Sequence, residues 1–190
     1  VSYERTYENE SENESENVSP SVDEDTEIRQ SDFPLDLGSA STFYIVLNKI
    51  DGMTVNPQLT TAESAMLQYR KDSNYHEIEV SIPDVKADTD AKMYELLQKS
   101  VSDIKDYLSE NSYYSQVECG TWNMLDSDKY EVSSLSMSYI YQNSEFVETT
   151  ALVKIADMKY LKIRIMECKD TSELDVPALI GSVVNAVSIK

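Results

Sequence analysis

The chain has 190 residues, a length that suits one domain, and it carries 35 acidic against 16 basic residues, a formal net charge of −19. Nucleic-acid binding needs clustered Lys and Arg, and no window supplies them, so we predict no nucleic-acid partner. No run of residues approaches the ~20 apolar positions that a membrane-spanning helix requires.

Acidic residues are concentrated at the amino-terminal end. Residues 1–36 contain 12 acidic and two basic residues, a net charge of −10, which leaves −9 for the rest of the chain. Residues 7–17 are a near-repeat of Glu, Asn and Ser, with little apolar surface to offset the backbone entropy lost on folding. We therefore predict a disordered tether over residues 1–38 and a single folded domain over residues 39–190.

The tether also bears on where the protein is located. The chain begins at Val1 rather than Met, which fits either a boundary chosen by an experimenter or the removal of a secretion signal, and the sequence leaves both open. An acidic, Ser- and Asn-rich segment ahead of a compact domain is typical of a tethered bacterial surface protein. We therefore expect an extracytoplasmic protein, either secreted or joined to a membrane only by a lipidated Cys upstream of Val1.

The first part of the predicted domain has strand-like sequences. Residues 43–47 form a short apolar run rich in β-formers, and an Asp-Gly turn pair follows it. A second extended stretch is expected over residues 64–70. Residues 75–82 then alternate strictly between apolar and polar side chains until a proline ends the pattern. This alternation predicts a half-buried antiparallel strand.

The next segment changes period and predicts an amphipathic helix over about residues 89–109. Asp88 or Thr89 can cap its first turn. Its apolar residues recur at steps of three and four, as expected for one buried face: Met93, Leu97, Val101, Ile104 and Leu108.

The remaining sequence returns to period two and then ends in a second helix. Four strands separated by short turns are predicted, over about residues 115–124, 130–141, 146–155 and 160–168. The last helix is expected to start near Ser172, with Asp175 in a capping box and Pro177 in the first turn. Runs of strands, rather than alternating strands and helices, predict an α+β fold with an antiparallel sheet of about six strands and two amphipathic helices.

One tetrapeptide in this part of the chain resembles a nucleotide-binding motif. Residues 48–51 read Asn-Lys-Ile-Asp after an apolar strand, as in the guanine-reading motif of small GTPases. A GTPase also needs a glycine-rich phosphate loop, and none of the four glycines is placed to form one. We therefore interpret the tetrapeptide as a chance match.

Cys119 and Cys168 are the two cysteines of the chain. If the last four strands form a simple meander, these residues lie on its first and fourth strands, about 14 Å apart, beyond the ~7 Å Cα separation that a disulfide allows. We favour free thiols, although a different strand order would permit a bridge.

Metal-binding and catalytic residue patterns are lacking in the sequence. His76 is the sole histidine, which weakens any site that depends on His. Asp84, Asp88 and Asp90 do not have the spacing of a calcium loop, and helix capping and solvation account for them. We predict no catalytic residue, no metal and no cofactor.

Tyrosine is unusually common, with 13 residues, and several cluster in the second half of the chain. Packing within a half-buried sheet is the commoner role of such residues. If they are exposed, they form a surface that binds protein or glycan. The candidate binding residues are Tyr113, Tyr114, Trp122, Tyr130, Tyr139 and Tyr141.

The order of elements resembles the PsbP-like family, in which an antiparallel sheet is flanked by helices. The resemblance covers about residues 43–189 and is carried by the strand Lys-Tyr-Leu-Lys-Ile-Arg-Ile at 159–165 and the helix end Ile-Gly-Ser-Val-Val-Asn-Ala-Val at 180–187. The family's amino-terminal Phe-x-(apolar)-x-Pro-x-x-Trp motif is missing. The resemblance implies a PsbP-like α/β/α sandwich and an extracytoplasmic accessory or binding protein, often lipid-anchored in bacteria and not an enzyme, and no functional residue is carried over.

The sequence thus predicts a non-catalytic, monomeric binding or accessory domain of a tethered bacterial protein, with a protein or a cell-wall component as its partner. The alternative is an envelope-associated hydrolase or transferase with a site made of carboxylates and Tyr. A deep pocket with two convergent, desolvated acids would favour the enzyme. A shallow aromatic surface would favour binding.

Overall fold

A computed structural model describes residues 30–38, 43–171 and 173–190, so most of the predicted tether lies outside the described residues. The helices are α1 (Asp90–Glu110) and α2 (Val176–Ala186). The strands are β1 (Leu35–Leu37), β2 (Ile45–Leu47), β3 (Met53–Val55), β4 (Ser64–Lys71), β5 (Asn74–Ser81), β6 (Tyr114–Cys119), β7 (Asn123–Leu125), β8 (Glu131–Tyr141), β9 (Ser144–Ala156), β10 (Lys159–Cys168) and β11 (Val187–Ile189). Within these ranges no helix is both long and apolar enough to cross a membrane.

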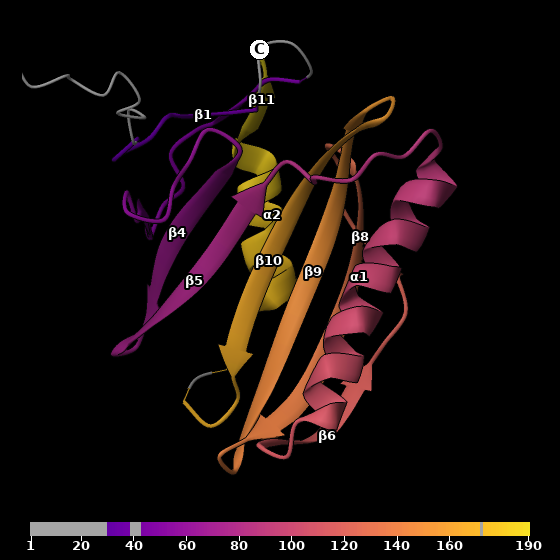
Figure 1. The fold of residues 1–190 in the computed structure, drawn as a ribbon. Coiled ribbons are helices and arrows are strands. Elements are labelled where there is room, and N and C mark those ends of the chain that lie inside the picture. Colours follow the sequence, from indigo (N-terminus) through magenta and orange to yellow (C-terminus); the bar gives the residue numbers. More distant parts are fainter. Residues whose placement is uncertain (1–29, 39–42, 172) are drawn as a thin grey trace, which may run out of the picture.

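The main element is an eight-stranded antiparallel sheet, which confirms the predicted fold class but is larger than the predicted six strands. Its order is β3-β4-β5-β10-β9-β8-β6, and β7 also pairs with β8 (Figure 1). The predicted meander is present in β8, β9 and β10. The stretch 115–124 is two strands rather than one, because β6 and β7 pair with different parts of β8 and a register shift interrupts β6.

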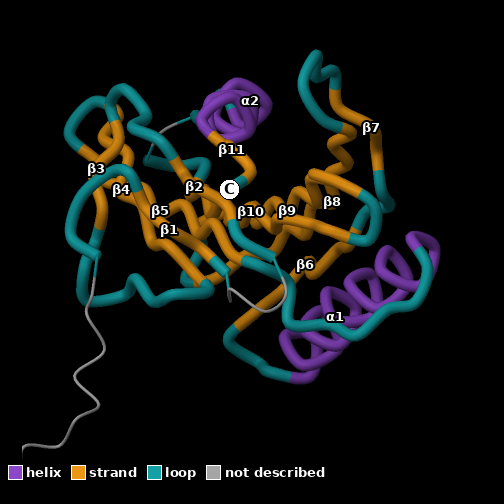
Figure 2. Tube along the Cα trace, turned by 90° about the horizontal axis from the view of Figure 1, so that it is seen from above, coloured by secondary structure: helices purple, strands orange, loops and turns teal. Residues whose placement is uncertain are grey.

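The two helices lie on opposite faces of this sheet (Figure 2). Met93 and Leu97 of α1 pack against Leu152, and Leu108 packs against Met137, so α1 covers the β6-β8-β9 half of one face. On the other face α2 packs its apolar stripe, which consists of Leu179, Ile180, Val183 and Val184, into a core to which β4, β5, β10, β9 and β8 all contribute, and β9 is the strand it contacts most.

Each helix begins at a side-chain cap. The Thr89 side chain accepts a hydrogen bond from the Lys92 backbone N–H at 3.2 Å, which confirms one of the two predicted caps of α1. The Asp175 side chain accepts from the Ala178 N–H at 3.1 Å. Asp175 is therefore the cap of α2 rather than a residue of its first turn, and α2 begins at Val176, later than the predicted start near Ser172.

A small sheet that we did not predict packs beside α2. It has the order β1-β2-β11, and it joins residues from the two ends of the described chain. Leu35 and Leu37 of β1 are fully buried. The predicted boundary at residue 38 therefore falls too late, because residues 35–37 bury their side chains in the core of the domain.

The Asn-Lys-Ile-Asp tetrapeptide has a structural role in this region. The Asn48 side-chain amide donates hydrogen bonds to the Ala186 carbonyl at 2.8 Å and to the Ser188 hydroxyl at 2.9 Å. Ile50 is buried in the main core. These contacts join β2 to the end of α2, which agrees with our interpretation of the motif as a chance match.

Candidate functional site

The half of the large sheet that neither helix covers is formed by β4, β5 and β10 on the α1 side. On β10, Ile163 and Ile165 point toward α2 and are buried, whereas Arg164 and Met166 point to the opposite face. Because α1 lies over β6, β8 and β9, it does not reach these residues. The same alternation on β5 turns Glu77 and Glu79 toward the uncovered face.

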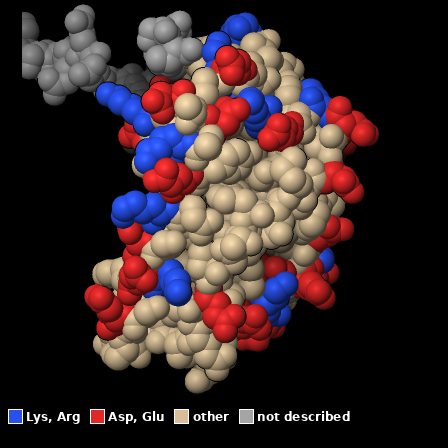
Figure 3. Space-filling model, turned by 90° about the vertical axis from the view of Figure 1, so that its right-hand side faces the viewer, with Lys and Arg blue, Asp and Glu red and all other residues tan. Residues whose placement is uncertain are grey.

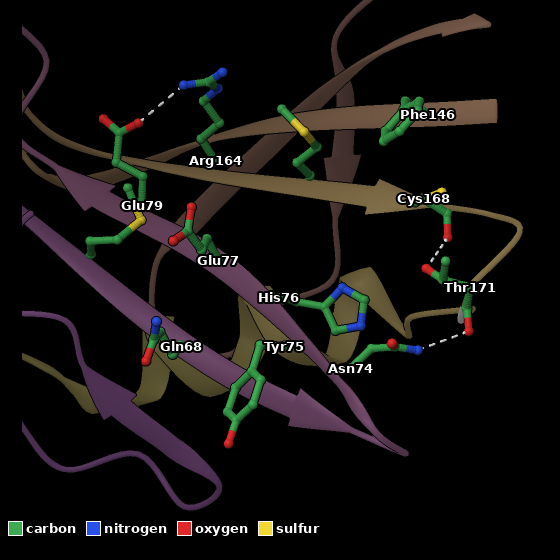
Figure 4. A pocket seen from close by; sticks show the side chains of 12 residues that line it. Gln68, Asn74, Tyr75, His76, Glu77, Glu79, Phe146, Arg164, Cys168 and Thr171 are labelled. Atoms are coloured by element: carbon green, nitrogen blue, oxygen red, sulfur yellow. Dashed lines mark hydrogen bonds and ion pairs between the residues drawn. The ribbon is translucent and has the colours of Figure 1, made fainter. Parts of the chain in front are cut away.

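This uncovered face holds a groove with a volume of about 480 Å³, which we call the sheet groove (Figure 4). Its lining combines apolar side chains, charged side chains and amides from four adjacent strands and the loop after β10. The lining residues are Met66, Gln68, Asn74, Tyr75, His76, Glu77, Glu79, Phe146, Arg164, Met166, Cys168 and Thr171.

An ion-pair network lies across the groove floor. The Arg164 guanidinium donates to the two Glu148 carboxylate oxygens at 2.7 and 3.1 Å, and it also reaches Glu79 at 3.4 Å. Lys162 approaches Glu79 at 3.6 Å. Donating hydrogen bonds to the Glu148 carboxylate raises the pKa of Arg164, although burial opposes the shift. Two carboxylates are thus held by cations, while Glu77 is exposed and forms no ion pair with any described residue.

Apolar side chains flank these charges. Met166 is 40% exposed and Tyr75 is 65% exposed, so two large side chains of neighbouring strands face solvent on the same side of the sheet. Tyr75 is contacted by the Arg70 guanidinium, 5.4 Å from the ring centroid. Phe146 lies at the opposite border. An exposed apolar surface of this kind, with a polar rim, is typical of an interaction site.

Three of the six predicted aromatic residues meet at this border. Tyr114 lies 5.1 Å from Tyr141 and 5.6 Å from Tyr139, measured between ring centroids. Tyr139 in turn stacks on Phe146 at 5.6 Å. Burial raises the pKa of Tyr139, with the Glu148 charge adding to the effect. The cluster packs under Leu108 of α1, so it supports one wall of the groove rather than forming an open surface.

The other three predicted residues lie elsewhere. Trp122 packs edge-on against Tyr94 at 5.2 Å near the amino-terminal half of α1, and its buried indole Nε1 has no hydrogen-bond partner among the described residues. Tyr130 packs against the main core on the α2 side. Tyr113 is 75% exposed after the end of α1. The structure thus does not bring the six residues together into one surface.

The residues that line the groove floor were not predicted, although the sequence carried a signal for them. On the strand that contains the buried Ile163 and Ile165, the alternate positions form a second face that the sequence predicts to be exposed to solvent. Met166 is an apolar residue on this second face. Met66 on β4 has a similar position. An apolar residue on the polar face of an amphipathic strand indicates that this face contacts something.

The two cysteines are both free. The strand order β10-β9-β8-β6 separates Cys168 from Cys119 by two intervening strands, as the predicted meander requires. Within the described ranges, no group of three or more His, Cys, Asp or Glu side chains is arranged to hold a metal ion. Asp90 instead accepts hydrogen bonds from Lys154 and Tyr160, and these contacts lower its pKa.

His76 lies at one end of the groove, where it is only 6% exposed. Burial lowers the pKa of its imidazole below 6.5, with Glu167 opposing the shift and Lys71 adding to it. The folded chain therefore binds this proton less readily than the unfolded chain does. The stability that the neutral imidazole provides is fully present above pH ~6.5 and decreases as the pH falls through the lower, folded-state pKa.

We expect this effect to appear in a comparison with His76→Gln. As the pH falls below about 6.5, the wild type should lose unfolding free energy relative to the variant by at most ~1.4 kcal/mol per pH unit. Above pH 7 the two curves should run parallel. Urea unfolding at a series of pH values measures this difference, and parallel curves from pH 7 down to pH 5 would contradict the assignment.

Figure 3 shows the side of the molecule that carries α1 and β6, and the charged side chains on this side reflect the acidic composition of the chain. Acidic side chains predominate on this face, and the basic side chains are interspersed among them. Uncharged surface occupies the middle of the same view. An acidic surface of this kind repels phosphate backbones and attracts cationic partners.

No protein-family model and no curated protein matches this chain. Among solved structures, it is similar to the solution structure of cyanobacterial PsbP (CyanoP) from Synechocystis sp. PCC 6803, with 11% sequence identity and a TM-score of 0.47. The match covers 81% of this chain and 90% of the cyanobacterial chain. A similarity of this size concerns the arrangement of helices and strands alone and says nothing about function.

Proposed function

We propose that this protein is a non-catalytic binding domain that uses the sheet groove to hold another macromolecule. The observation that carries the proposal is the uncovered half of the sheet, where Met166 and Tyr75 remain exposed beside an ion-pair network. Sheets of α+β domains bury their apolar faces against other elements. Here the partner, a protein or a component of the cell wall, would complete the cover.

The same geometry supports binding rather than hydrolysis or group transfer. General acid–base catalysis needs a carboxyl group that is free to exchange a proton with the substrate. Glu148 is 8% exposed and accepts two hydrogen bonds from Arg164, and Glu79 is shared between Arg164 and Lys162. Glu77, the other acid in the lining, forms no ion pair but is exposed, so the described residues of the groove do not supply two convergent, desolvated acids. The groove is also open to solvent on the uncovered face of the sheet, which suits a contact surface more than a site that excludes water.

The acidic amino-terminal segment supports an extracytoplasmic location for this domain. We propose that the segment acts as a tether, that the domain is monomeric, and that any attachment to a membrane is made through a lipid upstream of Val1. The segment's composition, which is poor in apolar residues and rich in like charges, is the support for this part of the proposal. A tether of this kind leaves the groove accessible to partners at a distance from the membrane.

Site-specific photo-cross-linking tests the proposed function. A benzophenone amino acid replaces Met166, on the groove floor, in the full chain expressed in the cells of origin. We expect irradiation to give a discrete product of higher mass, because a bound partner would lie within reach of the benzophenone. Release of the product by protease, or by wall hydrolase, distinguishes a protein partner from a wall component.

The matched control places the same amino acid at Glu118, which is also exposed but lies on the opposite face of the sheet. Position 118 should give no product, or a much weaker one. Equal products from both positions would show non-specific contact. The absence of any product at position 166 would contradict the assignment of the groove as the binding surface.

A further inference from the structure

A second cavity, on the opposite side of the molecule from the sheet groove, lies between α2 and β7. Figure 2 shows β7 and the loop after it rising from the sheet beside α2. The cavity has a volume of about 290 Å³, and we call it the α2 cleft. Apolar residues and one glycine make up most of its lining, among them Met124, Leu125, Val132, Ile180, Gly181 and Val184.

Gly181 is the unexpected residue of this cleft. It occupies the interior of α2, where Gly is less favourable than Ala because it loses more backbone entropy on folding. A Cβ placed on Gly181 would meet no heavy atom within 4 Å. Close packing therefore does not require Gly at this position. What the missing side chain does provide is free space inside the cleft.

Hydrogen bonds join the loop after β7 to the end of α2. The Lys129 ammonium donates a hydrogen bond to the Asn185 carbonyl at 3.0 Å and another to the Val187 carbonyl, at the end of α2. Ser127 accepts hydrogen bonds from two backbone N–H groups of the same loop, both at 3.4 Å. The loop is thus fastened to α2 without collapsing onto Gly181.

The chemistry of the cleft defines the ligand that fits. Val132, Ile180 and Val184 at its base are each at most 2% exposed, so the inner part is apolar. Asp126 lies at the rim, is exposed, and forms no ion pair with any described residue. With a net charge of −19 on the chain, this carboxylate favours a cation at the mouth.

We propose that the α2 cleft binds a small aliphatic amine, with its hydrocarbon chain against Gly181 and its ammonium group beside Asp126. The volume lies at the lower end of the range for small-molecule sites, which suits a chain of about six carbons rather than a larger ligand. This site is separate from the sheet groove and does not depend on the function proposed for it.

The test is a titration of the full ¹⁵N-labelled chain with n-hexylammonium, n-hexanol and n-hexanoate at constant ionic strength. We expect hexylammonium to shift the amide signals of Val132, Gly181 and Val184 with a Kd on the order of 1 mM. Hexanol should bind about fivefold more weakly, because it lacks the charge that pairs with Asp126. Hexanoate should be the weakest ligand.

Two variants separate the apolar from the charged contribution. Asp126→Asn should remove the preference for hexylammonium over hexanol and leave hexanol binding unchanged. Gly181→Leu should abolish the shifts from all three compounds. Gly181→Ala, which adds one methyl group to open space, should raise Tm by about 2–4 °C and confirm that the helix tolerates a side chain there.

Three results would overturn the proposal. These are shifts that do not localise to the cleft, hexanoate binding as tight as hexylammonium binding, and unchanged hexylammonium affinity in a folded Gly181→Leu chain. Folding of each variant is read from the dispersion of its remaining amide signals. Because Asp126 is exposed, the Asp126→Asn comparison stays decisive even where a leucine at position 181 disturbs α2.

Discussion

Replacing Ile163 with Ala is expected to lower the free energy of unfolding by about 2–5 kcal/mol, the range found when a buried aliphatic side chain is truncated to Ala. Ile163 lies in the middle of β10, is fully buried, and packs in the core beneath α2. Its removal leaves a cavity between the sheet and the helix that close-packed neighbours fill only in part. Urea unfolding followed by circular dichroism measures the change.

The matched control is Met166→Ala on the same strand. Met166 is 40% exposed and faces the sheet groove, so its truncation should cost less than about 1 kcal/mol in the isolated protein. The contrast between the two positions tests whether one face of β10 is packed and the other open. Similar decreases in the free energy of unfolding for the two variants would mean that the groove side of β10 is also buried. This result would contradict the proposed binding surface.

Gly38→Ala is expected to destabilise the domain by about 3 kcal/mol or more. Gly38 has a φ of +102°, in a region that side chains other than glycine rarely adopt. A Cβ there would lie 1.9 Å from the Phe43 carbonyl oxygen, so the backbone itself would have to move. The Gly38 N–H also donates to the Ala62 carbonyl at 2.7 Å, a contact that such a movement would disturb.

Gly120→Ala provides the comparison for Gly38. A Cβ on Gly120 would approach the Ser136 carbonyl oxygen at 3.4 Å, which is an ordinary contact distance. We expect a change below about 1 kcal/mol for this variant. A Gly38→Ala chain as stable as the Gly120→Ala chain would show that β1 is not fixed to the core, and that the domain starts after residue 38 as the sequence suggested.

Most of the fold could be predicted because its long elements bury one face. The alternation in β5 and β10, where every second residue is a buried aliphatic, indicates strands directly. The three-residue strands β1 and β11 are too short to show a period, and their pairing with β2 depends on contacts between distant parts of the chain. Tertiary packing, rather than local pattern, therefore determines the small sheet.

The candidate site was harder to predict for a related reason. Periodicity shows which side of a strand is apolar but does not show how far a helix extends across the sheet. The aromatic residues Tyr139 and Tyr141 were identified as candidates, and they lie beneath or beside α1 at the groove border. Arg164 and Glu79 come from strands that are far apart in sequence, and only the pairing of β5 with β10 brings them together.

The native thiols allow the most direct test of the central claim, that a partner covers the sheet groove. Cys168 lines the groove, whereas Cys119 lies on β6, outside it. Maleimide labelling of the unaltered protein, in the cells of origin and after purification, gives the ratio of modification at these two cysteines. We predict that Cys168 is protected in cells and reacts after purification, while Cys119 reacts equally in both. An unchanged ratio would contradict the claim.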